Sequence, residues 1–206
     1  MPLPWTVVVP VRHPERGKSR LGAGAAVARA IAVDTLAAAA PAAHRLILMT
    51  DADDWTAGLP GEVRLQCAPG LSAAVAEGVA AAGDGPVAVL LGDLPALRTA
   101  DLAAALAAAE AHPLARVPDH EGTGTTLITA LRGGEHQPAF GEDSNARHAA
   151  AGYVELTLPA SSSLRRDVDR AADLAALAEA GLLGAATRSA LREGQRVAGD
   201  GRGLLD

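Results

Sequence analysis

VAVLLGDLP, residues 87–95, is the stretch that decides the fold. Its first five residues are all apolar, which is typical of a strand buried on both faces of a parallel sheet. The Gly-Asp-Leu-Pro turn then ends the strand. Ligands of open α/β sheets bind beyond the carboxyl ends of the strands, so the turn that carries Asp93 also indicates where a functional site lies.

Strands and helices alternate around this stretch. Short apolar runs predict strands at 5–11, 45–50, 63–68, 114–118, 125–130 and 153–158. Ala-rich or amphipathic segments predict helices at 25–40, 71–82, 100–111, 144–151, 171–180 and 185–192, and Thr99 is expected to cap the third of them. This order predicts an α/β fold, a three-layer α/β/α sandwich around a mostly parallel mixed sheet.

The composition predicts one domain and excludes some classes of protein. The 206 residues fit a single domain spanning 1–206, and its Gly-rich tail at 199–206 is expected to be mobile. A net charge of −6 argues against a broad basic face that wraps nucleic acid. The single cysteine, Cys67, cannot form an internal disulfide, so a reducing cytoplasm is the simplest setting.

No membrane or targeting segment is expected. The longest apolar run, 27–40, is shorter than a bilayer span and contains Arg29 and Asp34. The first ten residues lack a basic segment and a small-residue cleavage site. The sequence leaves the oligomeric state open.

Three aspartates are candidate metal ligands. Asp93 follows the central strand, where a carboxylate can hold Mg²⁺; the alternative is a turn residue that hydrogen-bonds its own backbone. Asp167 and Asp169 alternate in LRRDVD, 164–169, and so share one face if the segment is extended. Two carboxylates on one face repel unless a cation lies between them, although a solvated charge cluster is the other interpretation.

Two further segments have features of anion sites. The loop 12–21, RHPERGKSRL, offers Lys18 and Arg20 to phosphate oxygens, although it is not a P-loop and an ordinary basic loop remains open. Ser144 stands where a helix should begin, three residues after Gly141, and its hydroxyl can join the free N–H groups of a helix start. A plain helix cap is the alternative for Ser144.

Six stretches in order resemble one family. They are VPVR with KSRL within 9–21, GLSAA at 70–74, LLGDLPAL at 90–97, GTGTTL at 122–127, FG…S…RH within 140–148 and LRRDVD at 164–169. Together they resemble the guanylyltransferases of coenzyme F(420) biosynthesis, which act on phosphoenolpyruvate or on 2-phospho-L-lactate. This resemblance implies a nucleotide-diphospho-sugar-transferase-like fold.

The resemblance also implies roles for particular residues. The magnesium-binding carboxylates would be Asp93, Asp167 and Asp169. The phosphorylated acid would be held by Thr126, Gly141 and Ser144. The nucleotide would be bound by Lys18, Arg12 and Ser72, although Arg12 replaces an expected Lys and Ser72 a common Asn. Lys18 and the three aspartates would be the catalytic residues.

The implied reaction joins GTP and phosphoenolpyruvate to give enolpyruvyl-diphospho-5'-guanosine and pyrophosphate. The attacking phosphate is already largely an anion at neutral pH, because its second pKa is about 6, so no general base is required. Alternative acids are 2-phospho-L-lactate and 3-phosphoglycerate. More distant alternatives are a molybdenum cofactor guanylyltransferase, whose Gly-rich loop is missing from 12–21, and a nucleotide-binding module without chemistry.

Overall fold

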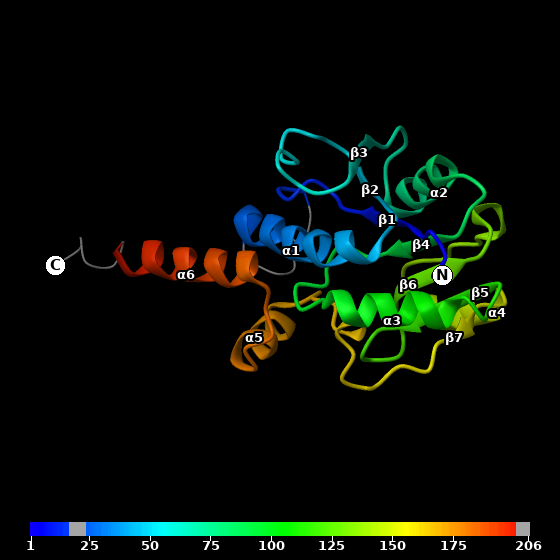
Figure 1. Ribbon diagram of the computed structural model, residues 1–206. Coiled ribbons are helices and arrows are strands. Elements are labelled where there is room, and N and C mark those ends of the chain that lie inside the picture. The colour runs from blue at the N-terminus through cyan, green and yellow to red at the C-terminus, as the bar shows by residue number, and fades with distance from the viewer. Residues whose placement is uncertain (17–23, 201–206) are drawn as a thin grey trace.

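A seven-stranded sheet forms the middle layer of the computed structural model, which describes residues 1–16 and 24–200 (Figure 1). Its order is β3-β2-β1-β4-β6-β5-β7. The strands are β1 (Thr6–Pro10), β2 (Arg45–Thr50), β3 (Glu62–Leu65), β4 (Val87–Leu90), β5 (Leu114–Pro118), β6 (Thr125–Ala130) and β7 (Val154–Glu155). Only β6 is antiparallel to its neighbours. The start of β6 therefore lies at the same sheet edge as the carboxyl ends of the other strands.

Helices cover both faces of the sheet. Successive residues of β1 point to opposite faces, so that Val7 and Val8 belong to different hydrophobic clusters. The Val7 cluster includes residues of α1 (Gly24–Ala39) and α3 (Thr99–Ala109), and the Val8 cluster includes residues of α2 (Leu71–Ala82). The short α4 (Ser144–Ala150) presents His148 to Tyr153, which belongs to the Val8 cluster. These layers confirm the α/β sandwich.

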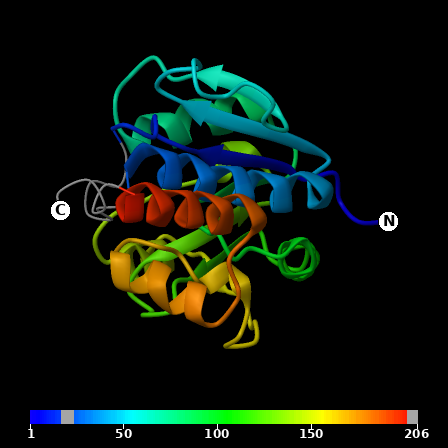
Figure 2. The same cartoon turned by 90° about the vertical axis from the view of Figure 1, so that its left-hand side faces the viewer.

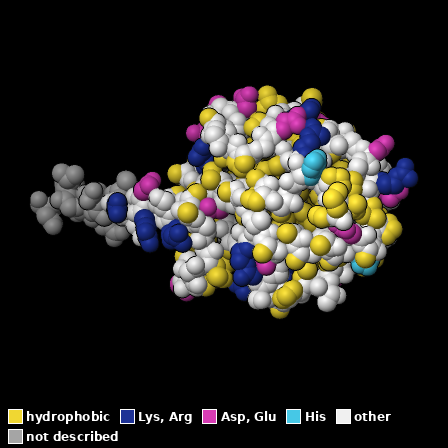
Figure 3. All heavy atoms as spheres, viewed as in Figure 1, with side chains coloured by type: hydrophobic (Ala, Val, Ile, Leu, Met, Phe, Trp, Pro, Cys, Tyr) yellow, Lys and Arg dark blue, Asp and Glu magenta, His cyan; other side chains and the backbone are white. Residues whose placement is uncertain are grey.

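Two helices complete the fold outside α1. The helices are α5 (Ala171–Glu179) and α6 (Ala185–Asp200), and Leu174 and Leu177 of α5, with Leu183 of the connection to α6, are buried around Val27 and Ile31 of α1. Figure 2 shows α6 running alongside α1, and Figure 1 shows its far end projecting from the body. Basic side chains follow α6 in Figure 3, because its arginines at 188, 192 and 196 recur every four residues and share a solvated face.

Most predicted elements are present, with differences at their ends. Single-turn 3-10 helices, η2 (Ala40–Ala42), η3 (Gly133–Glu135) and η4 (Ser163–Arg165), occupy positions predicted as irregular or as a helix end. The strand predicted at 153–158 contributes only β7, because β7 is an edge strand paired to β5 alone. The helix predicted at 185–192 continues to Asp200, so residues 199 and 200 are helical, whereas 201–206 lie outside the described residues.

Two expectations about helices are corrected by the structure. Thr99 is the first residue of α3 rather than its cap, and its hydroxyl donates to the carbonyl oxygen of Ala38 at 2.8 Å. With the turn η2 included, the apolar segment Gly24–Ala42 is 19 residues long, enough by length and composition to cross a membrane. In this structure its inner face, including Ile31 and Leu36, is buried in the hydrophobic clusters. The length argument against a span was therefore wrong, while the packing is that of a core helix.

The start of α6 is capped by a carboxylate from α1. Asp34 accepts hydrogen bonds from the backbone N–H groups of Ala186 (3.0 Å) and Thr187 (2.8 Å). A negative charge at a helix N-terminus is favourable because it satisfies free N–H groups and complements the helix dipole. Gly184 permits this approach, since a Cβ there would lie 2.2 Å from the Asp34 carboxyl carbon.

We expect Asp34→Ala to destabilise the protein by about 1–2 kcal/mol, the usual cost of losing a helix cap. For a chain of this size the change lowers Tm by roughly 2–8 °C. Thermal unfolding of the variant measures it, with Asp84→Ala as the control, because Asp84 is exposed and accepts no hydrogen bond from the described residues. Equal Tm values for both variants would show that the cap contributes nothing.

Candidate active site

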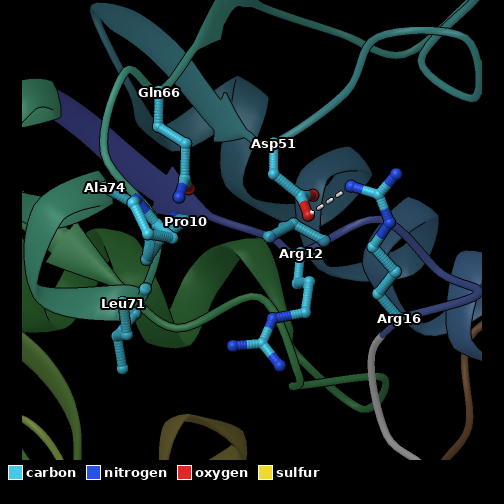
Figure 4. A pocket seen from close by; sticks show the side chains of 10 residues that line it. Pro10, Arg12, Arg16, Asp51, Gln66, Leu71 and Ala74 are labelled. Carbon is cyan, nitrogen blue, oxygen red and sulfur yellow. Dashed lines mark hydrogen bonds and ion pairs between the residues drawn. The ribbon is translucent and has the colours of Figure 1, made fainter.

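A groove runs along the carboxyl edge of the sheet. One part, of about 270 Å³, lies over the ends of β1, β2 and β3 and is lined by Arg12, Asp51, Gln66 and Gly70 among others (Figure 4). The second part, of about 230 Å³, lies between the ends of β1 and β4 and reaches Asp93. The two parts share Arg12. Because the chain leaves β1 for β2 on one side and returns to β4 on the other, the groove lies at the point where the strand order reverses, the usual ligand position in open α/β sheets.

A glycine lets β4 end close to β1 in this groove. A Cβ on Gly92 would lie 2.5 Å from the Val11 side chain and 3.2 Å from the Pro10 carbonyl oxygen. Such contacts are too short for any side chain to be accommodated without movement of β1. The glycine of LLGDLPAL therefore shapes the floor of the groove in front of Asp93.

Arg12 offers an uncommitted positive charge to the groove. Its side chain is exposed and forms no hydrogen bond or ion pair with a residue that the structure describes. Figure 4 shows the guanidinium pointing away from Asp51. The role of Arg12 beside a nucleotide stays a prediction. Lys18 belongs to 17–23, outside the described residues, and Ser72 is exposed on α2 next to Leu71, which lines the groove.

Asp51 was missed by the sequence analysis. Its carboxylate accepts hydrogen bonds from the backbone N–H of His13 (2.6 Å) and from Nη1 of Arg16 (3.2 Å). Burial raises the pKa of Asp51, but these two partners outweigh burial and leave the pKa below its ordinary value. Asp51 thus fastens the loop after β1 to the end of β2. Its position directly after a predicted strand was the only available signal.

The segment that carries Asp167 and Asp169 is fastened to the turn that carries Asp93. The backbone N–H of Val168 donates to the carbonyl oxygen of Asp93 at 3.0 Å, and the Val168 side chain is fully buried among α1, α5 and α6. Val168 therefore points into the core between two acidic neighbours. The structure brings the three predicted carboxylate residues to one region of the site.

Neighbouring negative charges change the pKa of Asp167. Burial, followed by the negative charges of Asp93, Asp169 and Asp119, raises the pKa of Asp167 to about 7. Its Oδ1 atom is buried and accepts no hydrogen bond from the described residues, and Nδ1 of His120 lies 3.8 Å from it. As they lie in the structure, no three His, Cys, Asp or Glu side chains within 1–16 and 24–200 are grouped so that they could hold a metal ion. The carboxylates are thus near enough to repel one another but do not form a closed cage.

Asp119, the fourth acidic residue, organises the Gly-Thr-Gly turn. It follows β5 and accepts hydrogen bonds from the N–H groups of Thr123 (3.0 Å) and Gly124 (2.8 Å). A Cβ on Gly124 would lie 2.3 Å from Oδ2 of Asp119, so a side chain here would displace the carboxylate from these hydrogen bonds. The sequence analysis did not select Asp119, although it follows a predicted strand.

The residues predicted to hold the acid lie near the start of α4. Ser144 is the first residue of α4, its N–H donates to the Gly141 carbonyl oxygen at 3.1 Å, and Gly141 has φ +111°. The cap position belongs to Asp143, so the alternative of Ser144 as a plain cap is wrong. Thr126 is buried and its hydroxyl donates to the Val117 carbonyl oxygen at 3.3 Å. Their role in binding the acid stays a prediction.

The raised pKa of Asp167 predicts how stability depends on pH. Its folded-state pKa of about 7 exceeds the ordinary 3.8, so its contribution to stability is complete below pH 3.8 and is lost as the pH rises to about 7. The buried histidines His136 and His148, whose pKa values are lowered to about 4, act in the opposite direction. We therefore expect the Tm of Asp167→Asn minus the Tm of wild type to increase as the pH rises from 4 to 8 in the absence of divalent metal. A difference that stays constant with pH would contradict the raised pKa.

Several known proteins are similar to this chain. A Streptomyces coelicolor phosphoenolpyruvate guanylyltransferase is 47% identical over 188 residues, covering 82% of this chain and 88% of its own. A Salinispora arenicola protein of the same name is 45% identical, covering 97% of this chain and 98% of its own. No family model matches the sequence.

Solved structures show the same fold. A nucleotide-diphospho-sugar transferase from Desulfovibrio desulfuricans, so named on a provisional basis, superposes with a TM-score of 0.72 at 22% identity, covering 94% of this chain and 96% of its own. A Mycobacterium tuberculosis protein solved as a complex with manganese has a TM-score of 0.61 at 19% identity, covering 87% of this chain and all of its own. The first confirms the nucleotide-diphospho-sugar-transferase-like fold.

Proposed function

The chain belongs to the family of the phosphoenolpyruvate guanylyltransferases, and from this premise we propose that it transfers GMP from GTP to phosphoenolpyruvate, in coenzyme F(420) biosynthesis. The observation that carries the proposal is the 45% identity to a relative of this name over nearly the whole of both chains. The groove supports it, because its position at the strand-order reversal suits a nucleotide. We place the enzyme in the cytoplasm. It acts on small molecules and binds neither nucleic acid nor a membrane.

The two substrates occupy different parts of the site. GTP lies in the groove, with its phosphates near Arg12 and the Gly92–Asp93 turn. The positive charge of Arg12 offsets part of the triphosphate charge. The acid lies toward Thr126, Gly141 and Ser144, so that the two substrates meet in front of Asp93. Lys18 and Ser72 complete the contacts to the nucleotide.

The reaction is a displacement at phosphorus. An oxygen of the phosphoenolpyruvate phosphate attacks the α-phosphorus of GTP, forming a P–O bond while the α–β anhydride bond breaks and pyrophosphate leaves. Because the attacking oxygen is already an anion at neutral pH, no proton has to be removed first. The protein's part is to position two polyanions in line and to reduce their repulsion.

We further propose that Asp93, Asp167 and Asp169 hold Mg²⁺. A buried Asp167 oxygen that accepts no hydrogen bond from the described residues, and the repulsion that Asp93 and Asp169 exert on Asp167, fit a cation. Oxygen donors suit Mg²⁺, and the manganese in the distant M. tuberculosis protein is a precedent within the fold. When bound, the metal supplies charge neutralisation for the triphosphate and the leaving pyrophosphate.

Pyrophosphate release tests the proposed function. The purified protein is mixed with Mg²⁺, GTP and one acid at a time: phosphoenolpyruvate, 2-phospho-L-lactate or 3-phosphoglycerate. We expect the highest kcat/KM with phosphoenolpyruvate. A higher kcat/KM with 2-phospho-L-lactate would overturn the choice of acid. If no pyrophosphate were released with any of the three acids, the proposed function would be overturned.

Ser144→Ala tests the predicted acid contact. We expect it to weaken binding of phosphoenolpyruvate by roughly 1–3 kcal/mol, the usual cost when a charged group loses a hydrogen-bond partner. Steady-state KM values and calorimetry measure the loss, and binding of GTP should change little. Ser189→Ala on α6 is the control, because among the described residues its hydroxyl bonds only to the exposed Glu193. Equal losses for acid and GTP would mean that Ser144 has a structural role alone.

A further inference from the structure

A buried histidine on α4 joins two segments beside the predicted acid site. The Nε2 atom of His148 lies 2.9 Å from the backbone nitrogen of Ala139, and its Nδ1 atom lies 3.0 Å from Oγ1 of Thr125. A backbone N–H can only donate, so Nε2 is the acceptor and the ring proton is on Nδ1. Burial, followed by the positive charges of Arg116 and Arg147, lowers the pKa of His148 to about 4. The ring is therefore neutral at pH 7 with a fixed tautomer.

This tautomer determines what the Thr125 hydroxyl can do. Because Nδ1 already carries a proton, Thr125 cannot donate its own hydroxyl hydrogen to His148 and accepts from it instead. No other residue in the described part of the chain accepts that hydrogen. Thr126 differs, since its hydroxyl donates to the Val117 carbonyl oxygen. Thr125 thus retains a donor, although it is the neighbouring threonine that the family resemblance selects.

Strand pairing places Thr125 between the two substrate regions. Leu90 of β4 pairs with Leu127 of β6, and the N–H of Leu91 donates to the Thr126 carbonyl oxygen at 2.9 Å. Thr125, the next residue along the antiparallel pair, therefore lies beside Gly92, one residue from Asp93. The register irregularity between Val117 and Pro118 belongs to this end of β6 and alters the alternation of its side chains.

His148 also fixes the segment that leads to Ser144. Its ring accepts a hydrogen bond from the backbone N–H of Ala139, two residues before Gly141. The ring also packs edge-on against Phe140 and Tyr153, with ring centroids 5.0 Å and 5.3 Å apart. The backbone N–H of Asn145 donates to the Thr123 carbonyl oxygen at 3.0 Å and so joins α4 to the Gly-Thr-Gly turn. The Asn145 side chain adds a hydrogen bond from Nδ2 to the Gly122 carbonyl oxygen at 2.8 Å, so the His148 ring and Asn145 together hold the two sides of the predicted acid site.

We propose that His148 is a positioning residue of the acid site, which holds the Thr125 hydroxyl oxygen so that its hydrogen donates to the phosphorylated acid beside Ser144. The proposal rests on the proposed function. A carboxylate or phosphate oxygen is the acceptor that this donor fits, because the reacting acid carries only acceptors at neutral pH.

Thr125→Val removes the donor and keeps the shape of the side chain. We expect KM for phosphoenolpyruvate to rise by about tenfold or more, while KM for GTP changes less than about threefold. Thr125→Ser keeps the hydroxyl and should restore most of the affinity. The matched control is Thr129→Val on the same strand, a fully buried threonine whose hydroxyl donates to the Ala115 carbonyl oxygen.

A second variant tests the positioning role of the ring. His148→Leu should raise KM for phosphoenolpyruvate as Thr125→Val does, and the double variant should lose little more, since both remove one interaction. If His148→Leu does not fold, the Thr125→Val variant alone decides whether the inference holds.

The outcomes separate the inference from the proposed function. An active wild-type enzyme whose Thr125→Val variant has an unchanged KM for phosphoenolpyruvate, or equal increases in both KM values, overturns the inference alone. A wild-type protein that releases no pyrophosphate with any acid overturns both.

Discussion

Asp93→Asn lowers turnover by several orders of magnitude and leaves the fold intact. The change keeps the shape of the side chain and removes one negative charge from the region where Asp93 acts on Asp167. The metal proposed there neutralises both polyanions, so a weakened site loses charge compensation in the transition state. Asp167→Asn and Asp169→Asn should have comparable effects. Single-turnover rates at saturating GTP and phosphoenolpyruvate measure the loss.

The control for Asp93→Asn is Asp84→Asn, an exposed aspartate outside the site. It should retain wild-type turnover, and circular dichroism should show native secondary structure and cooperative unfolding for both variants. If the turnover of Asp93→Asn stayed within tenfold of wild type, Asp93 would not be a ligand of the proposed metal.

Arg12→Ala raises KM for GTP by about 10–100-fold, because a hydrogen bond to a charged group contributes roughly 1.5–3 kcal/mol. Arg12 lines both parts of the groove and has no partner among the described residues, so its loss leaves no buried group unsatisfied. Tm should therefore stay close to that of wild type. Steady-state kinetics with varied GTP, and separately with varied phosphoenolpyruvate, measure the two KM values.

Arg12→Lys should recover part of the affinity for GTP, since it keeps the charge but loses the forked geometry of the guanidinium. KM for phosphoenolpyruvate should change little in either variant. An effect of Arg12→Ala on the acid alone would place the acid, and not the nucleotide, in the groove.

The layers of the fold could be predicted because each strand carries its own signal. The run at 87–91 is apolar throughout, and the structure gives β4 at Val87–Leu90 in the middle of the sheet. Edge strands are harder to predict, because β7 pairs on one side only and its two residues are exposed. The antiparallel direction of β6 depends on tertiary pairing, and no pattern within 125–130 encodes it.

The candidate site could be predicted only where a residue follows a strong strand or matches the family resemblance. Asp93, Asp167 and Asp169 were predicted in this way, and the hydrogen bond between Val168 and Asp93 joins their two segments, while their role as metal ligands stays a prediction. Asp51 and Asp119 were missed, because their importance comes from hydrogen bonds to loops that a sequence does not place. The pairing of His148 with Thr125 joins residues 23 positions apart across two elements, and spacing alone does not reveal it.

The direct test of the proposed reaction is the structure of its product. Phosphorus NMR and mass spectrometry of a reaction with GTP, phosphoenolpyruvate and Mg²⁺ should show a diphosphate that links guanosine to the enolpyruvyl group, together with an equal amount of pyrophosphate. Its formation should require both substrates. Appearance of GDP and inorganic phosphate in place of the linked diphosphate would contradict the account.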